Sequence, residues 1–309
     1  MATLYINGVS FSTATAIYTD PQLTTCAPDG FYSFEGAVRE LSGCVLQPIG
    51  ICDECIPPCG QILQVQGTQG FYSLPTSLGS DIGAVAVRFY TGGIPDGIRV
   101  IYDGVIYNKL SCTLDGYHGT TTNDGFTYLG NADNICVDNG VGGNPLIDGS
   151  PYDLSRYEWS PSISDFVDTG LTETVNVVAG DISTVLGWTG IWATMVIPKT
   201  TLTPTSLLAE ISAPCPNGTG WYIEVFCPVV LTPFASTSIE ASSINACASG
   251  SSVTYYNYPI SGTAGNPAVN DFVFSDENGA NPLPAGWYKF GTSAFETNDF
   301  GVIISMVSC

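Results

Sequence analysis

The sequence has very few positively charged residues. It carries 7 Lys+Arg against 28 Asp+Glu, a formal net charge of −21, and charged residues of both signs make up only 11% of its 309 positions. Nucleic-acid binding depends on neutralising phosphates with cations, so this balance argues against a nucleic-acid partner. The same negative charge disfavours anionic membranes, keeps the chain soluble and suits weak binding of divalent cations.

Long apolar runs and helical repeats are also missing. No stretch is long enough to cross a bilayer, and no segment repeats its apolar residues with the period of a helix. Residues 1–8 lack the basic start and the apolar centre of a secretory signal. We therefore expect a chain that is made in the cytoplasm without a signal peptide and is not inserted into a membrane.

Signatures of catalysis are scarce. His118 is the only histidine, it lies in an expected loop, and no Gly-x-Ser-x-Gly elbow accompanies it. A serine or cysteine nucleophile needs a base beside it, and neither a phosphate-binding loop nor a dinucleotide fingerprint occurs. We therefore expect a protein that is not an enzyme. Two carboxylates that meet in space and cleave a polysaccharide are the alternative.

Glycine (35), proline (20) and short apolar segments are abundant, and hydrophobic residues make up 44% of the chain. The pattern is clearest at residues 92–108, where Asp103-Gly104 supplies a tight turn between apolar segments at 98–102 and 105–108. Together with residues 83–90, these segments predict a meander of three neighbouring strands. Many short strands separated by turns indicate an all-β protein.

The spacing of these strands predicts three parts. Residues 60–230 are expected to form a central β-sandwich that is jelly-roll-like. Residues 1–59 are expected to form a small β-module in front of it. Residues 231–309 are expected to contain a Ser/Thr/Ala-rich connector, at 231–271, with an aromatic strand at 255–258, and then a second small β-module.

The two ends of the chain share a motif. Residues 18–20 and 28–34 (Tyr-Thr-Asp and Pro-Asp-Gly-Phe-Tyr-Ser-Phe) align without a gap on residues 274–276 and 284–290 (Phe-Ser-Asp and Pro-Ala-Gly-Trp-Tyr-Lys-Phe). Pro-x-Gly sets a turn, and the aromatic residues that follow alternate along a strand. The sequence therefore predicts one module that is used twice.

A module of about 40 residues buries too little apolar area to fold well alone. Its aromatic side chains must then be covered, and a position at each chain end favours a neighbouring subunit as the cover. Packing on the central domain is the alternative. The expected interface residues, all large and aromatic as interfaces prefer, are Phe31, Tyr32, Phe34, Trp287, Tyr288 and Phe290.

Two kinds of metal site are conceivable. Asp115, Asp124 and Asp133 lie in a loop-rich region with the oxygen ligands that Ca²⁺ prefers, although solvated turn residues are the plainer interpretation. Cys52, Cys55 and Cys59 could bind zinc with Cys26 or Cys44 as a fourth ligand. For the 11 cysteines as a whole the sequence favours buried thiols, with disulfides and zinc as alternatives.

Two resemblances point to a context. Residues 94–104 (Ile-Pro-Asp-Gly-Ile-Arg-Val-Ile-Tyr-Asp-Gly) and 220–228 (Gly-Trp-Tyr-Ile-Glu-Val-Phe-Cys-Pro) resemble the opening and closing strands of a jelly-roll module of secreted and virion proteins. The flanking motif, Tyr-Thr-Asp and then Ala-Pro-Asp-Gly-Phe-Tyr-Ser before a terminal cysteine, resembles repeats in fibre and appendage proteins of tailed bacteriophages, notably those that infect Bacteroidetes-type hosts.

These resemblances imply a structural protein of the virion: a fibre, a capsid-decorating protein or a tail-associated component. The expected partners are further copies of the chain and other virion proteins. The alternative is a carbohydrate-binding adhesin for host attachment, with a host surface glycan as its ligand and calcium assisting. Neither resemblance carries over a catalytic residue.

Overall fold

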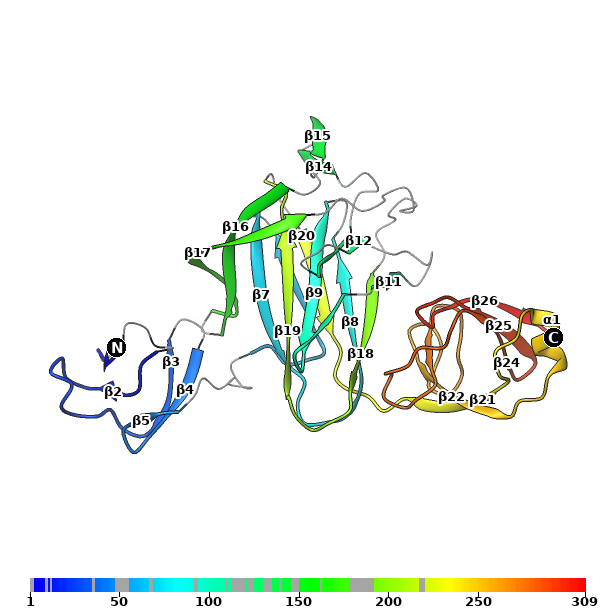
Figure 1. Ribbon diagram of the computed structural model, residues 1–309, viewed down its shortest axis with the longest axis horizontal. Coiled ribbons are helices and arrows are strands. Elements are labelled where there is room, and N and C mark those ends of the chain that lie inside the picture. The colour runs from blue at the N-terminus through cyan, green and yellow to red at the C-terminus, as the bar shows by residue number, and fades with distance from the viewer. Residues whose placement is uncertain are drawn as a thin grey trace.

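The structure is a computed structural model, and the chain is all-β (Figure 1). The structure describes residues 3–8, 11, 13–34, 37–47, 56–66, 69–91, 94–108, 110–112, 120–121, 125–129, 135–138, 141–145, 150–161, 163–177, 192–216 and 220–309. Figure 1 shows the N-terminal strands, a central sandwich and the C-terminal strands following one another along the long axis. Within the described residues there is one α-helix, α1 (Ser243–Ala248).

Two sheets form the central sandwich. The first contains β7 (Gly70–Ser77), β9 (Asp96–Tyr102), β10 (Val105–Tyr107), β12 (Thr120–Thr121), β13 (Thr127–Leu129), β16 (Ser150–Ser160), β17 (Asp165–Val177) and β19 (Ser206–Ala213). The second, in the order β11-β18-β8-β20-β6, contains β6 (Gln61–Gln66), β8 (Gly83–Tyr90), β11 (Ser111–Cys112), β18 (Ala193–Lys199) and β20 (Gly220–Val225). A separate hairpin joins β14 (Ile135–Asp138) to β15 (Val141–Pro145).

Alternation along the strands creates the core between the two sheets. In β8, Val85, Val87 and Phe89 point inward, while Arg88 and Tyr90 point to the outer face. Trp221 of β20 is fully buried in the same cluster, with side chains from β7, β9 and β19 opposite. The sandwich predicted for residues 60–230 is therefore present as two packed, mostly antiparallel sheets.

The hairpin at the Asp103-Gly104 turn is confirmed, but the meander is wrong. Asp103 and Gly104 both have positive φ (50° and 74°), and β10 pairs with β9 directly across them. β8, however, pairs with β18 and β20 in the other sheet. Both β8 and β9 alternate apolar residues toward one core, so the sequence pattern alone does not tell in which sheet each strand lies.

The N-terminal strands form two small sheets. They are β1 (Tyr5–Ile6) with β2 (Ile17–Tyr18), and β3 (Gly30–Phe34) with β4 (Ala37–Ser42) and β5 (Val45–Leu46). Their own apolar cluster includes Phe11, Ile17 and Leu41. This part of the chain therefore has a small core separate from that of the sandwich.

The C-terminal strands form two three-stranded sheets. They are β21 (Thr232–Ser236), β22 (Val253–Tyr258) and β23 (Phe272–Phe274), and then β24 (Gly286–Phe290), β25 (Ser293–Thr297) and β26 (Ile303–Ser308). Phe234 of β21 packs with Tyr288 and Phe295 in the core between them. The aromatic strand expected at 255–258 is confirmed as part of β22, but residues 231–271 also supply β21 and α1, so they are more than a connector.

Two aspartates shape equivalent turns in the N- and C-terminal parts. Asp20 and Asp276 each accept three backbone N–H bonds from the turn that follows. The donors are Gln22, Thr24 and Thr25 in the first turn and Asn278, Ala280 and Asn281 in the second, at distances between 2.6 and 3.1 Å. Each aspartate is therefore followed by the same hydrogen-bonded turn.

Two tyrosines repeat in the same way. Tyr32 Oη donates a hydrogen bond to the carbonyl of Pro28 at 2.6 Å, and Tyr288 Oη donates to that of Pro284 at 3.0 Å. In addition, β3 pairs with β4 in the same register in which β24 pairs with β25. The motif that the two chain ends share in sequence therefore also shares its hydrogen bonds.

The preference for buried thiols is wrong for the seven cysteines whose side chains the structure describes. Disulfides join Cys26 to Cys44 in the N-terminal part, Cys59 to Cys227 beside the sandwich, and Cys247 to Cys309 in the C-terminal part. Cys215 is also disulfide-bonded. The fold brings together cysteines as far apart as positions 59 and 227, a pairing that spacing along the chain could not indicate.

Candidate functional site

The outer face of the β11-β18-β8-β20-β6 sheet carries a cluster of aromatic side chains. Tyr90 of β8 and Tyr222 of β20 point outward by strand alternation, and Trp192 precedes β18 on the same side. Their ring centroids lie 5.6 to 6.3 Å apart, and all three side chains are half-buried. We call Tyr90, Trp192 and Tyr222 the aromatic face.

Arg88 lies next to the aromatic face. Its guanidinium forms an ion pair with the Glu224 carboxylate from the neighbouring strand. It also lies over the ring of Trp192, at 5.0 Å, and over that of Phe226, at 4.8 Å. The carboxylate and the two rings hold the cation in place, so Arg88 connects the aromatic face to the region around Phe226.

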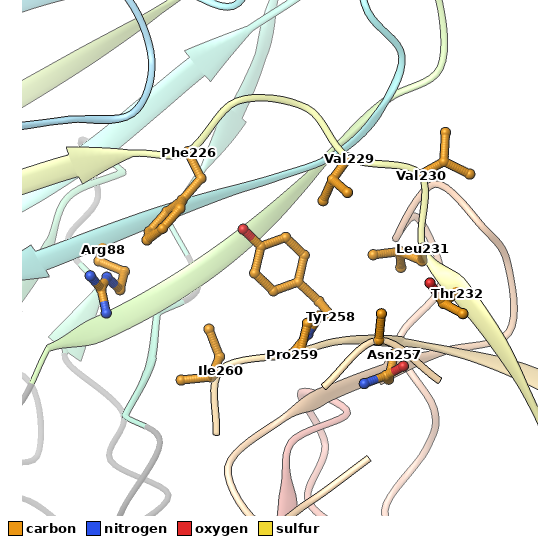
Figure 2. A pocket seen from close by; sticks show the side chains of 11 residues that line it. Arg88, Phe226, Val229, Val230, Leu231, Thr232, Asn257, Tyr258, Pro259 and Ile260 are labelled. Carbon is orange, nitrogen blue, oxygen red and sulfur yellow. The ribbon is translucent and has the colours of Figure 1, made fainter. Parts of the chain in front are cut away.

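That region is a pocket of about 310 Å³ between the sandwich and the C-terminal strands (Figure 2). Figure 2 shows Tyr258 in the middle, with Arg88 and Phe226 on one side, Leu231 on the other, and Ile260 below. Burial raises the pKa of Tyr258 to about 12, with Arg88 opposing and Glu224 adding to this rise. The tyrosine is therefore neutral, and the pocket is mainly apolar.

Beside the pocket, the C-terminal part and the residues just before it pack against the sandwich. Ala84 and Val229 exchange two backbone hydrogen bonds, of 2.8 and 3.0 Å. Ala84 and Ala86 share an apolar cluster with Phe272 and Phe274. The pocket thus lies at the edge of a packed junction, which holds the aromatic face at a fixed place relative to the C-terminal strands.

Chemically, this face suits the binding of a ligand with flat apolar surfaces. Half-buried rings offer apolar area, and the tyrosine hydroxyls offer hydrogen bonds at the rim. Sugar rings have such apolar faces and a rim of hydroxyl groups.

Sequence reasoning missed this site, although Arg88 and Tyr90 at alternate positions of a predicted strand could have indicated an outward-facing pair.

All the lysines and arginines that the structure describes are held by partners within the chain. Four arginines bond acids or carbonyls, and two lysines bond carbonyls. The pairs and carbonyl contacts are Arg88–Glu224, Arg99–Glu210, Arg156–Glu158, Arg156–Glu173, Arg39 with the carbonyls of Phe11, Ala14, Leu46 and Gln47, Lys199 with those of Thr201 and Leu202, and Lys289 with those of Cys247 and Ser249. The net charge of −21 is therefore carried by acids in excess of these pairs.

Most of the expected metal ligands lie where the structure does not describe the chain, and one of them is contradicted. Asp115, Asp124 and Asp133, together with Cys52, Cys55 and His118, lie outside the described residues. Cys59 as a zinc ligand is wrong, because its sulfur is bonded to that of Cys227. Across the described part of the chain, no three His, Cys, Asp or Glu side chains gather as a metal site would require.

The six expected interface residues also fall into different environments. Tyr288 is almost fully buried in the C-terminal core and cannot be an interface residue in this fold. Phe290 packs on Phe234 with ring centroids 5.6 Å apart. Tyr32 and Trp287 are half-buried, and the side chain of Phe34 is outside the described set. Phe31 is 76% exposed.

No helix among the residues that the structure covers has the length and apolar character needed to span a bilayer. Comparison of the chain with protein-family models, with curated proteins and with solved structures found no significant match to any of them.

Proposed function

We propose that the chain is a non-enzymatic structural component of a tailed bacteriophage particle, a fibre, capsid-decorating or tail-associated protein. The observation that carries the proposal is the pair of related β-modules on either side of the sandwich, with Asp20 and Asp276 in equivalent turns. Their motif resembles repeats of phage fibre and appendage proteins. Modules at both ends of a chain suit a subunit that joins neighbours in an assembly.

The disulfides support a role outside the cell. One disulfide lies in the N-terminal part, one beside the sandwich and one in the C-terminal part. Of these three, Cys59–Cys227 joins the cysteines that are farthest apart in sequence, by 168 residues. Such bonds persist in oxidising surroundings and are rare where thiols are kept reduced. A particle that is released from the host meets those surroundings.

The exposed Phe31 provides the test of assembly through the modules. A tagged chain that is expressed during infection should sediment with the particles in a density gradient. Phe31→Ala should lower the amount of tagged chain in the particle band, since it removes an exposed aromatic side chain from a flanking module. Leu171→Ala on β17 is the control, because Leu171 is 63% exposed and lies in the sandwich, outside both flanking modules. A chain that never enters the particle band contradicts the proposal.

The absence of an enzymatic activity is tested separately. The purified chain is incubated with capsular and cell-wall polysaccharides, and the products are sized. We expect no cleavage. Reproducible cleavage that is lost in Glu224→Gln, the carboxylate beside the aromatic face, would instead identify a glycan-degrading enzyme.

The aromatic face favours a second function, attachment to a host surface glycan. Tyr90, Trp192 and Tyr222 form a half-buried cluster on an outer sheet surface. Glycan-array binding should then be lost in Trp192→Ala and retained in Phe31→Ala, which lies in another part of the chain. Loss of binding with a chelator would add calcium to this function, and binding that Trp192→Ala leaves unchanged would remove the aromatic face from it.

A further inference from the structure

In the C-terminal part, one segment covers the edges of both small sheets. β21 pairs with the outer edge of β22, and the chain then passes to β24, where Glu240 and Trp287 exchange two backbone hydrogen bonds of 2.8 and 3.1 Å. Between them, Thr237 Oγ1 accepts the N–H of Lys289. Residues 232–240 therefore act as one covering strand for two sheets.

The N-terminal module has counterparts of the strands that this segment covers. In the N-terminal module, Tyr5 of β1 pairs with Tyr18 of β2. In the C-terminal part, Tyr256 of β22 pairs with Phe274 of β23, and Phe274 is the residue that aligns with Tyr18 in sequence. β1 is therefore the counterpart of β22. β3 is the counterpart of β24. Among the described residues, however, β1 pairs only with β2, and β3 only with β4. The module lacks a described counterpart of the covering strand.

The backbone of Phe31 offers hydrogen bonds at this open edge. Trp287 directs its N–H and C=O away from β25, toward Glu240. Phe31 has the same register on β4 that Trp287 has on β25. Because hydrogen-bonding direction alternates along an antiparallel strand, the N–H and C=O of Phe31 also point away from β4.

An apolar surface accompanies the open edge. Phe234 of the covering strand is buried in the C-terminal core, at 6.4 Å from the ring of Tyr255. The counterpart of Tyr255 by register is Leu4, which is 41% exposed, and Phe31 is 76% exposed. Leu4 is thus an exposed apolar side chain that a residue at the place of Phe234 would contact. Phe31 adds a second exposed apolar side chain at the same edge, on the strand face opposite Tyr32.

We propose that the edges of β1 and β3 bind an extended segment of another particle protein, which adds a strand as residues 232–240 do in the C-terminal part. The segment carries a large apolar residue at the place of Phe234 and is neutral or basic, because the chain has a net charge of −21. The proposal rests on the assembly role given above and names the surface that performs it.

A second copy is disfavoured as the donor of this strand. Its residues 232–240 already cover its own sheets, and the disulfide Cys247–Cys309 and the hydrogen bond from Ser249 to Glu240 hold the following turn in place. Releasing the segment would expose Phe234 and its neighbours in the C-terminal core. No described segment of a second copy is therefore free to donate the strand, and we assign the donor to a different chain.

The test uses the full chain and, as the probe, a synthetic peptide of residues 231–241 (Leu-Thr-Pro-Phe-Ala-Ser-Thr-Ser-Ile-Glu-Ala) in which Glu240 is replaced by Gln, so that its side chains are neutral. Hydrogen exchange is followed by mass spectrometry at rising peptide concentration. We expect exchange to slow in residues 3–7 and 30–34, and this slowing to be lost with the Phe234→Ser peptide. No slowing at saturating peptide, or slowing confined to residues 232–290, overturns the proposal.

A pair of variants separates backbone addition from mere hydrophobic contact. Phe31→Pro removes the outward N–H and leaves the hydrogen bonds to β4, so peptide binding should be lost. Phe31→Ala keeps the N–H and should bind more weakly than the wild type but measurably. Equal binding by Phe31→Pro and Phe31→Ala contradicts strand addition. If Phe31→Pro also speeds hydrogen exchange in residues 37–46, the variant has disturbed the module itself. The comparison of the probe peptide with the Phe234→Ser peptide then decides whether the segment binds. Because no particle is needed, failure here leaves the particle test of the proposed function intact.

Discussion

Arg39 stands at the position of the N-terminal module that Phe295 occupies in the C-terminal one. Arg39 pairs with Tyr32 across the β3–β4 ladder, and Phe295 pairs with Tyr288 across β24–β25. Phe295 stacks on Tyr288 at a centroid distance of 5.5 Å. The same fold thus contains a buried cation in one copy and an aromatic ring in the other.

The buried Arg39 organises the N-terminal module, and its loss should open that module alone. Its guanidinium donates to the carbonyls of Phe11, Ala14, Leu46 and Gln47. Arg39→Met leaves these acceptors unpaired, which should cost about 3 kcal/mol or more of unfolding free energy. Hydrogen exchange should quicken in residues 11–47 and stay unchanged in 231–309. Arg39→Lys keeps the charge but loses the planar guanidinium, so it should also destabilise the module. If Arg39→Lys has the stability and the hydrogen exchange of the wild type, this role is refuted.

The carboxylate of Asp276 should make the C-terminal module sensitive to acid. Burial alone would raise the pKa of Asp276, but hydrogen bonds from the backbone N–H groups of Ala280, Asn281 and Asn278 outweigh it and lower the pKa. Since the folded pKa lies below the unfolded one, the stabilisation is complete above the unfolded pKa and is lost as pH falls through the folded pKa.

This dependence is measured by thermal unfolding between pH 7 and pH 3. Asp276→Asn should lose about 1 kcal/mol at pH 7 and show a smaller further loss on acidification than the wild type. Asp299→Asn, at an exposed position, is the control and should follow the wild-type curve. An unchanged acid response in Asp276→Asn would show that other groups govern it.

The disulfides should stabilise their modules in proportion to the loops they close. Cys247–Cys309 spans 62 residues and Cys26–Cys44 spans 18. In the chain-entropy account, removing them as paired Cys→Ala variants costs about 4 and about 3 kcal/mol. Hydrogen exchange at rising denaturant concentration measures the unfolding free energy of each module and shows which of the two losses is larger. A smaller loss for the Cys247/Cys309 variant would mean that strain or residual structure outweighs chain entropy.

Gly97 should tolerate no side chain, because the ring of Tyr128 lies against it. A Cβ on Gly97 would lie 2.7 Å from the nearest ring atom, whereas one on Gly250 meets nothing within 4 Å. Gly97→Ala should therefore destabilise the sandwich by about 1–3 kcal/mol through overpacking. Gly250→Ala is the control and should be close to neutral. Chemical denaturation monitored by tryptophan fluorescence distinguishes the two.

The sequence predicted the strands well where turn chemistry or alternation was strong. Asp103-Gly104 defined a hairpin, and the shared Pro-x-Gly-aromatic motif predicted matching modules at both ends. These features are local, so residues close in sequence determine them.

The features that were missed depend on contacts between distant segments. Phe234 is the one large aromatic residue of β21, so a Ser/Thr/Ala-rich segment concealed a strand that tertiary packing stabilises. The pairing of Cys59 with Cys227 follows from strand order and not from spacing. The aromatic face brings together Tyr90, Trp192 and Tyr222 from three segments of the chain, which no single motif reveals.

The central claim is that the chain is a built-in part of a virus particle. Quantitative mass spectrometry of washed, gradient-purified phage particles from a culture that produces the chain tests this directly. We expect the chain at a fixed ratio to the major structural proteins, unchanged by further washing with salt. A chain that is abundant in the lysate but missing from the purified particles would contradict the account.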